Sequence, residues 1–163
     1  INNARLELDS VGGRVEIAVT GLPAGLGEPF FDSAESILSH WYFSIPAVKA
    51  VEFGIGAKFG ESYASDVNDS MYCEDGKVYT RTNNCGGICG GITNGMPVTA
   101  LLTFKPTPSI AKAQQSVNVE TMENTTLEVR GRHDPCIVRR AAVVCEAATA
   151  LALMDLYMEG GCR

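Results

Sequence analysis

Hydrophobic and polar residues alternate in several short segments, which is the pattern of half-buried β-strands. Residues 15–19 alternate between two glycines on one side and a Gly-Leu-Pro sequence on the other, so we expect a strand there. Residues 48–53 form a second short apolar run that fits a strand, and residues 78–79 indicate another strand after the Asp-Gly turn at 75–76. The first half of the chain therefore predicts three short strands.

The second half of the chain contains further strand signals. Residues 96–104 are apolar and rich in residues that favour strands, and the Asn-Gly pair at 94–95 is the strongest short hairpin signal in the sequence. We therefore predict a strand pair around this Asn-Gly turn. Residues 116–120 and 126–129 predict two more short strands.

Two segments have the spacing of helices. Asp32-Ser33-Ala34-Glu35 resembles a capping box with Asp32 as the cap, and apolar residues then recur at helical spacing to about residue 44. Residues 137–158 predict a long helix that is apolar on nearly every side, which indicates burial within a larger body or against a partner.

These elements define the expected architecture of one domain. Strands and helices mix without regular β-α-β alternation, so the fold class is α+β, with mixed or antiparallel strands packed against helices and a long C-terminal helix. We expect the first dozen residues to fray.

Composition and charge narrow the functional classes. With 45% hydrophobic and 20% charged residues the chain folds, and its net charge of −6 argues against a nucleic-acid partner. The apolar run near the C-terminus is interrupted by Glu146 and Asp155, so we expect no membrane span, and no export signal is visible. A chain of this size builds a core without disulfides, so we interpret the six cysteines as reduced thiols of a cytoplasmic protein; they stand at positions 73, 85, 89, 136, 145 and 162.

A glycine-rich segment at residues 83–95 is the first candidate for chemistry. Glycine pairs let a backbone approach a flat or charged ligand, although a tight bend between strands explains the same pattern. Cys85 and Cys89 form a C-x3-C arrangement, but the chain has no second cysteine pair of this kind and only two histidines. We therefore expect no metal site.

Two further segments carry charged side chains at fixed points of the backbone. Two prolines hold the loop after Phe104, which suits Lys105 to an anionic ligand, or else Lys105 is an ordinary solvated lysine. Asp134 before Pro135 predicts a helix N-cap, which places Arg132 beside the positive end of a helix dipole.

Five sequence blocks together resemble the chorismate synthase family. The family patterns are G-[VIL]-P-A-G-L-G-E-P, S-I-x-A-V-K-G-V-E, N-N-x-G-G-I-x-G-G-[IM]-[ST]-N-G-M, F-K-P-T-P-[ST]-I and R-[HS]-D-P-[CT], the last with Glu146 downstream. The matching residues are 21–29, 44–52, 83–96, 104–110 and 132–136, in the same order along nearly the whole chain.

The resemblance implies a lyase of the shikimate pathway of aromatic amino-acid biosynthesis. Chorismate synthases eliminate phosphate from 5-enolpyruvylshikimate 3-phosphate in a 1,4-anti sense to give chorismate, and they need reduced FMN although no net redox change occurs. The family commonly forms tetramers, so the resemblance also implies a homotetramer. The expected fold is half of the family's sandwich fold.

Roles for individual residues follow from the same resemblance. Asp134 corresponds to the carboxylate proposed to relay a proton, and Arg132 to an arginine at both flavin and substrate. Many family members carry asparagine or glutamine at position 46; because this chain has Pro46, contact there would come from its carbonyl or ring, and the Ala47 N–H becomes the expected donor. The other expected flavin contacts are Gly90, where a side chain would collide, and the loop residues Lys105, Pro106, Thr107, Pro108 and Ser109.

The family's chains are roughly twice as long, so residues 1–163 correspond to the C-terminal core portion. The missing half carries phosphate-binding arginines and two histidine proton donors, and His40 aligns with neither histidine. We therefore expect the 163-residue chain alone to be inactive. The alternative is a non-catalytic flavin-binding or oligomerisation module that associates through the long helix.

Overall fold

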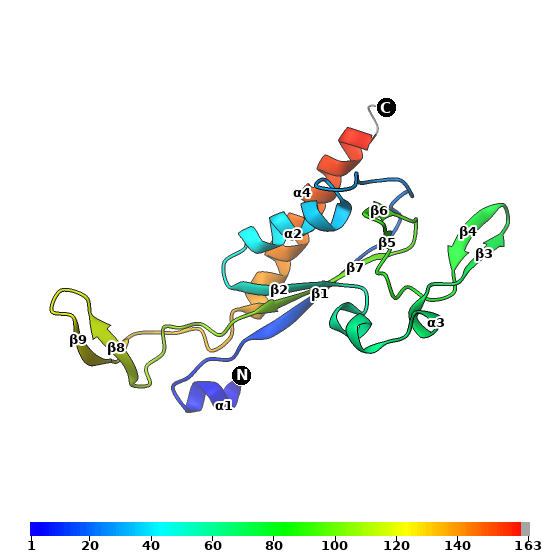
Figure 1. Ribbon diagram of the computed structural model, residues 1–163. Helices are drawn as coiled ribbons and strands as arrows, with labels where there is room; N and C mark the ends of the chain where they lie inside the picture. The colour runs from blue at the N-terminus through cyan, green and yellow to red at the C-terminus, as the bar shows by residue number, and fades with distance from the viewer. Residues whose placement is uncertain (161–163) are drawn as a thin grey trace.

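A three-stranded antiparallel sheet forms the centre of the molecule. The computed structural model describes residues 1–160. β7 (Val98–Phe104) is the central strand, between β1 (Gly13–Val19) and β2 (Val48–Phe53), and both neighbours run antiparallel to it (Figure 1). These strands confirm the expectations for residues 15–19, 48–53 and 96–104.

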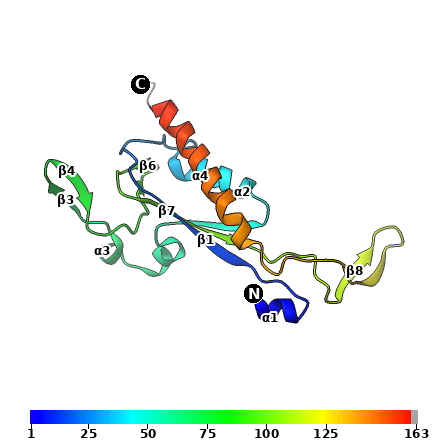
Figure 2. The same ribbon diagram turned by 180° about the vertical axis from the view of Figure 1, so that it is seen from behind.

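Two helices cover one face of this sheet. α4 (Val138–Gly160) packs on β1, and α2 (Ala34–Ser44) packs on β2 and on α4 (Figure 2). Burial alternates strictly along β7, because every second residue of a strand points to the same face. The core lies between this face and the helices; its most completely buried large side chains are Leu38, Tyr42, Val98, Leu102, Phe104 and Cys145.

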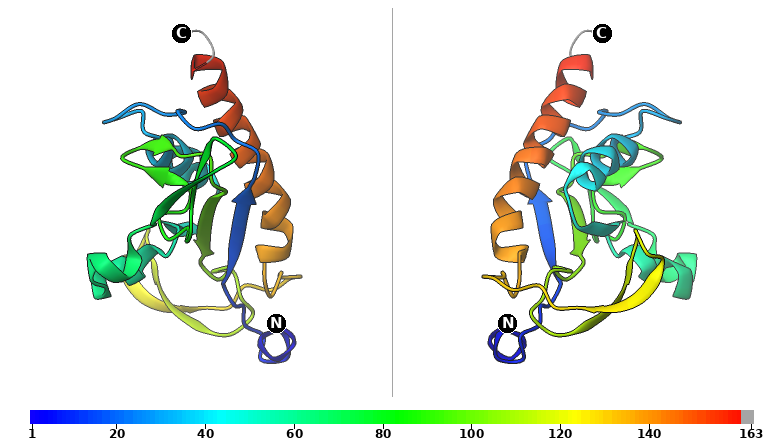
Figure 3. Two further views of the ribbon diagram at one scale, coloured as in Figure 1. Left: turned by 90° about the vertical axis from the view of Figure 1, so that its right-hand side faces the viewer. Right: turned by 90° about the vertical axis from the view of Figure 1, so that its left-hand side faces the viewer.

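Three hairpins and three short helical segments extend from this core. The hairpins are β3 (Met71–Glu74) with β4 (Lys77–Thr80), β5 (Ile88–Cys89) with β6 (Ile92–Thr93), and β8 (Gln114–Asn118) with β9 (Glu123–Leu127). The first and last project from opposite ends of the molecule (Figures 1 and 2), and the N-terminus lies at the foot of the sheet, away from the far end of α4 (Figure 3). The helical segments are α1 (Asn2–Leu6), the 3-10 helix η1 (Gly56–Glu61) and α3 (Ala64–Val67). The mixture of helices and antiparallel strands confirms the α+β class.

The expected hairpin turn at Asn94-Gly95 is wrong. The turn lies at Gly90-Gly91, where both residues have positive φ angles, of 61° and 87°, as a tight two-residue turn requires. Residues 94–95 instead connect β6 to β7, which belong to different sheets. The two expected strands near residues 116–120 and 126–129 exist but start earlier, as β8 and β9.

Both predicted helix caps are also wrong. Ser33, not Asp32, caps α2, because its side chain accepts a hydrogen bond from Ser36 N at 3.1 Å. α4 begins at Val138, so Asp134 does not cap it and Cys136 lies before it. Cys145, on α4, is fully buried.

The exposed side of α4 carries apolar residues. By length and composition alone α4 could cross a membrane; in this structure one side of it packs on the sheet and on α2, with Ala141, Cys145, Ala148, Ala152 and Leu156 buried. Its outer face exposes large apolar side chains: Val143, Val144, Leu151, Met154, Tyr157 and Met158. The helix is thus apolar on nearly every side as expected, although charged residues such as Arg139, Glu146 and Asp155 also lie on its exposed side; only one side is buried within residues 1–160.

Candidate functional site

The loop after β7 meets the residues before β2 at one end of the sheet. Phe104 pairs with Val48, so Lys105 lies beside Ala47, and Lys105 N donates a hydrogen bond to Ala47 O at 2.9 Å. Ala47 has a φ of +73°, an uncommon conformation for a residue with a Cβ. Two of the predicted flavin-binding segments are therefore adjacent.

Residues 10–12 connect this loop to the third predicted segment. Ser10 Oγ donates to Thr107 O at 2.6 Å, and Val11 N donates to Pro135 O at 2.8 Å. A Cβ on Gly12 would lie 2.4 Å from Phe104 O, so only glycine allows the chain to pass here. The expectation that the first dozen residues fray is thus wrong for residues 10–12, which form a clasp on the loop through these contacts. Residues 2–6 form the short helix α1.

Most of the predicted binding side chains at this end of the sheet are solvent-exposed, including Lys105 and Arg132. Asp134 is partly buried and forms an ion pair with Arg140 through its Oδ2 atom. His133 lies next to it, with Nε2 2.7 Å from Val129 O. This end of the sheet therefore presents two exposed cations and one paired carboxylate.

Thr107 supplies an observation that bears on ligand binding here. Its Oγ1 atom is buried and has no hydrogen-bond partner within residues 1–160. A buried hydroxyl without a partner costs roughly 1–3 kcal/mol, so such a group usually belongs to a site that something else completes. The exposed cations Lys105 and Arg132 would attract an anionic ligand. Residues of this kind fit a phosphate-bearing cofactor such as FMN.

Gly90 lies at the opposite end of β7. It is in the β5–β6 turn, and the seven residues of β7 separate this turn from Lys105 by roughly 20 Å. A Cβ on Gly90 would have no described atom within 4 Å, so the space beside it is open. The structure brings the predicted residues 46–47, 105–109 and 132–134 together and places Gly90 apart from them.

The block at 21–29 joins Gly90 at that end. Thr93 Oγ1 accepts a hydrogen bond from Leu26 N and donates one to Pro23 O, at 2.9 and 2.8 Å. Gly91 O in turn accepts from Ala34 N, the start of α2, at 2.8 Å. The five sequence blocks are thus gathered into two groups at the two ends of the central strand.

Asp69 is a site residue that the sequence did not reveal. Its carboxylate accepts hydrogen bonds from Asn84 N, Cys85 N and Thr82 Oγ1 at 2.7–2.8 Å, and so holds the start of the glycine-rich segment. Burial raises the pKa of Asp69, but these hydrogen bonds together lower it further, and its pKa is below the usual value. A whole hairpin separates Asp69 from its partners, so no local motif could indicate the contact.

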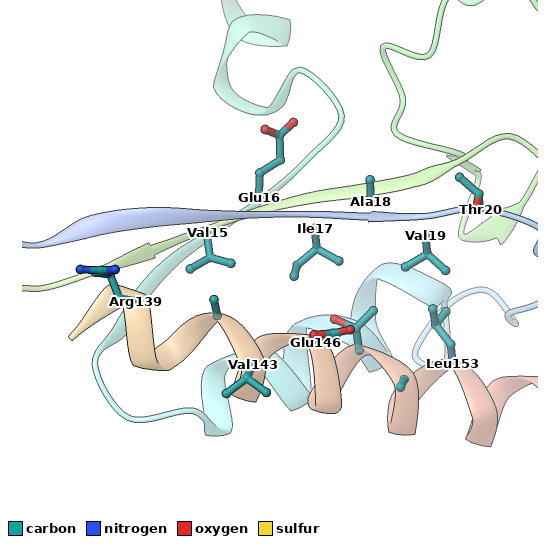
Figure 4. Close-up of a pocket in the computed structure, with 13 residues that line it drawn as sticks. Val15, Glu16, Ile17, Ala18, Val19, Thr20, Arg139, Val143, Glu146 and Leu153 are labelled. Carbon is teal, nitrogen blue, oxygen red and sulfur yellow. The ribbon is translucent and has the colours of Figure 1, made fainter. Parts of the chain in front are cut away.

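A groove of about 730 Å³ lies between β1 and α4 (Figure 4). Val15, Ile17 and Val19 point across it toward α4, and Arg139 and Glu146 are its charged residues on the helix. Glu146 is the residue that the resemblance placed after the last block. Within residues 1–160 this groove contains none of the predicted flavin contacts, and its largely aliphatic walls suit apolar groups.

Comparisons with known proteins identify what the chain is similar to. A family model described as chorismate synthase matches residues 1–158. The chorismate synthases of Methanobrevibacter smithii and Methanothermobacter thermautotrophicus are 48% and 50% identical to the chain over 161 and 162 residues. A crystal structure of chorismate synthase has a TM-score of 0.78 at 28% identity and matches 97% of this chain.

The matches cover this chain almost completely but the other proteins only in part. The two sequence alignments include 99% of this chain, and 44% and 43% of the respective relatives. The structural match covers 40% of the other chain. The chain therefore spans less than half the length of the relatives it matches.

Proposed function

The chain belongs to the chorismate synthase family, and on that basis we propose that the protein eliminates phosphate from 5-enolpyruvylshikimate 3-phosphate in a 1,4-anti sense to form chorismate. The observation that carries this proposal is the convergence at one end of β7. Residues 46–47, 105–109 and 132–134 are remote in sequence, yet hydrogen bonds join the segments that contain them: Lys105 N donates to Ala47 O, and Ser10 and Val11 donate to Thr107 O and Pro135 O. A loop held at both ends in this way can keep charged groups in fixed positions.

We propose that residues of this loop hold reduced FMN. When bound, reduced FMN would supply electron density that weakens the carbon–oxygen bond to phosphate. Lys105 and Arg132 would provide the positive charge that favours an electron-rich ring and a phosphate group. Thr107 Oγ1 would gain the partner it lacks within residues 1–160, and Pro46, Ala47, Pro106, Pro108 and Ser109 would form the surrounding wall. Gly90 would contact the flavin only if another part of the protein bridges the length of β7.

Asp134 is the proposed proton carrier. Arg140 contacts its Oδ2 atom, so Oδ1 is the oxygen that would accept and pass on a proton. The ion pair fixes the orientation of the carboxylate without needing the helix cap that the sequence predicted. This role follows from the match to the family block and from the position of Asp134 beside the joined loops.

We further propose that the whole protein is a cytoplasmic homotetramer with a small-molecule substrate and no nucleic-acid or membrane partner. The apolar outer face of α4 and the net charge of −6 support this assignment. The same face of α4 also supports the second candidate, an oligomerisation module without catalysis. Association without flavin binding or turnover would favour that candidate, whereas flavin binding without turnover would favour a non-catalytic flavin-binding module.

The deciding experiment measures turnover under anaerobic conditions with reduced FMN. The protein used should be of the full length of the relatives and include this chain. Chorismate and phosphate should be quantified in the same reaction. We expect Asp134→Asn to lower kcat by about 100- to 10,000-fold while flavin affinity stays within about twofold. Lys112→Gln is the control, because Lys112 is exposed and pairs only with Asp9 among the contacts of its side chain in residues 1–160. Full activity in the Asp134→Asn protein would refute the role of Asp134.

A further inference from the structure

Two cysteines occupy related places in the glycine-rich segment. In the pattern N-N-x-G-G-I-x-G-G, Cys85 and Cys89 stand at the two open positions, and every other position of this stretch matches. Both thiols are free. Cys85 is partly buried and Cys89 is exposed, and the Cys89 thiol is one of the neighbouring groups that raise the pKa of the Cys85 thiol.

The surrounding backbone holds both cysteines in place. Cys85 N donates to the Asp69 carboxylate at 2.8 Å, and Cys89 pairs with Ile92 in the β5–β6 hairpin. Between the cysteines, Gly86 and Gly87 have φ angles of 66° and 79° and lie in the turn at residues 84–87, so the chain bends between Cys85 and Cys89. Three intervening residues can close a disulfide only if the chain bends in this way, because the two Cα atoms must lie within about 7 Å.

We propose that Cys85 and Cys89 form a reversible disulfide, a modification site that closes a small ring within the glycine-rich segment. This proposal concerns the chain itself and does not depend on the proposed catalytic activity. It assigns a chemical role to two side chains that the proposed function does not use.

The oxidant is a low-molecular-weight disulfide, and the reaction balances in two exchange steps. The exposed Cys89 Sγ attacks one sulfur of the oxidant, a mixed disulfide forms, and the first thiol leaves. Cys85 Sγ then attacks Cys89 Sγ, the mixed disulfide breaks, and the second thiol leaves. Two protein thiols are oxidised, the oxidant is reduced to two thiols, and the protein loses two hydrogen atoms.

The environment of Cys85 slows the second step. Burial and then the neighbouring Asp69 carboxylate raise the pKa of the Cys85 thiol to about 11. Since only the thiolate attacks, ring closure should accelerate by about tenfold per pH unit between pH 7 and 9. Reduced thiols would therefore persist in a reducing compartment, and closure would follow only a sustained oxidising challenge.

The test uses the purified protein, oxidised glutathione as the probe, and alkylation followed by mass spectrometry. Trypsin should release residues 82–112 as one peptide, because the bond after Lys105 precedes a proline, and this peptide contains no cysteine except Cys85 and Cys89. In the wild type we expect this peptide to lose two hydrogen atoms and to resist alkylation until dithiothreitol is added. In the Cys85→Ser protein, Cys89 should instead retain a stable glutathione adduct.

Matched controls keep the result unambiguous. Cys73→Ser should leave ring formation unchanged, because Cys73 is exposed on β3. Cys145 is fully buried and should resist alkylation in every folded variant, which reports that the protein is intact. A wild-type peptide that keeps both thiols, that carries a persistent glutathione adduct, or that links to Cys73 would overturn the proposal. Closure that does not accelerate with pH would overturn it equally.

Discussion

At single glycines of this protein, two backbone segments pass so close to each other that a side chain would not fit between them. Gly54 has a φ of +56°, and a Cβ there would lie 1.8 Å from Asn84 O. Two backbone hydrogen bonds stabilise this close approach: Gly54 N donates to Thr99 O at 3.2 Å, and Ile55 N donates to Asn84 O at 2.8 Å. The glycine-rich segment is therefore anchored to the end of β2 by backbone atoms alone.

Replacement of Gly54 by alanine should destabilise the fold strongly. A Cβ would both strain the left-handed backbone and collide with a carbonyl oxygen that cannot rotate away, so we expect a loss of about 3 kcal/mol or more in the free energy of unfolding. Gly60→Ala is the matched control, since a Cβ there would have no described atom within 4 Å, and it should change stability by less than about 0.5 kcal/mol. Urea unfolding measures the free energy of unfolding of both variants. Equal stabilities would contradict the conclusion that a side chain at position 54 collides with Asn84.

At the scale of elements, one buried polar contact joins the two core helices. The Tyr42 hydroxyl on α2 and Thr149 Oγ1 on α4 lie 2.9 Å apart, and Thr149 Oγ1 also donates to Cys145 O at 2.7 Å. Both side chains are almost completely buried. The contact fixes the relative position of α2 and α4 over the sheet.

Tyr42→Phe should lower the free energy of unfolding by about 1 kcal/mol at pH 7, the usual net value of a buried hydrogen bond. Burial raises the pKa of Tyr42 above its ordinary value of 10.0, so in strong base the unfolded phenol ionises while the folded one stays neutral. The stability of the wild type should therefore decline as the pH rises above 10, and the variant should lose part of that decline.

Denaturant titrations between pH 7 and 11 provide the measurement. Tyr63→Phe, at an exposed position, is the control and should match the wild type throughout. Parallel curves for the wild type and the Tyr42→Phe protein would show that ionisation of Tyr42 does not contribute.

Helices and strands were predictable where the hydrophobic pattern is strong, and features that depend on contacts between distant parts of the chain were missed. Alternation predicted β1, short apolar runs predicted β2 and β7, and apolar density predicted α4, because each buries a continuous face. The start of α4 was predicted to within one residue, from the helix expected at residues 137–158. The clasp at residues 10–12 could not be predicted, because Val11 N is held by Pro135 O, more than a hundred residues away. Asp69 was missed for the same reason.

The candidate site was predictable mainly through family motifs. Spacing alone identified the Lys105 loop and the Asp134 segment as rigid and charged, but it left ordinary structural explanations open. The hydrogen bonds of Ser10 and Val11 bring these two segments together, and no pattern in the sequence indicates such pairing. The distance between Gly90 and Lys105 could not be predicted from the sequence either, because it depends on the direction in which β7 runs.

At the scale of the whole molecule, the candidate site is an open surface. Lys105 and Arg132 are exposed at one end of the sheet, and the glycine-rich turn lies at the other. The elimination of phosphate needs a site from which water is excluded and in which charges act strongly. The 163-residue chain spans less than half of its relatives, and residues 1–160 alone do not enclose such a site.

We therefore expect the isolated 163-residue polypeptide to release no phosphate from 5-enolpyruvylshikimate 3-phosphate in the presence of reduced FMN. A malachite-green assay of phosphate and the absorbance of chorismate provide the measurement, and the longer protein serves as the positive control. Circular dichroism of the isolated chain must show its helices, so that inactivity is not a folding failure. Turnover by the isolated chain would show that this surface suffices.

The central strand has a consequence for how the family can vary. β7 carries one group of sequence blocks at each end, and alternate side chains along it enter the core. Insertion of a single residue into β7 would move every following side chain of the strand to the opposite face of the sheet. It would also shift one group of sequence blocks relative to the other by a few ångströms, about one strand repeat. Substitution of one apolar core residue of this strand by another therefore keeps the two groups in place, whereas a change in the number of residues in the strand does not.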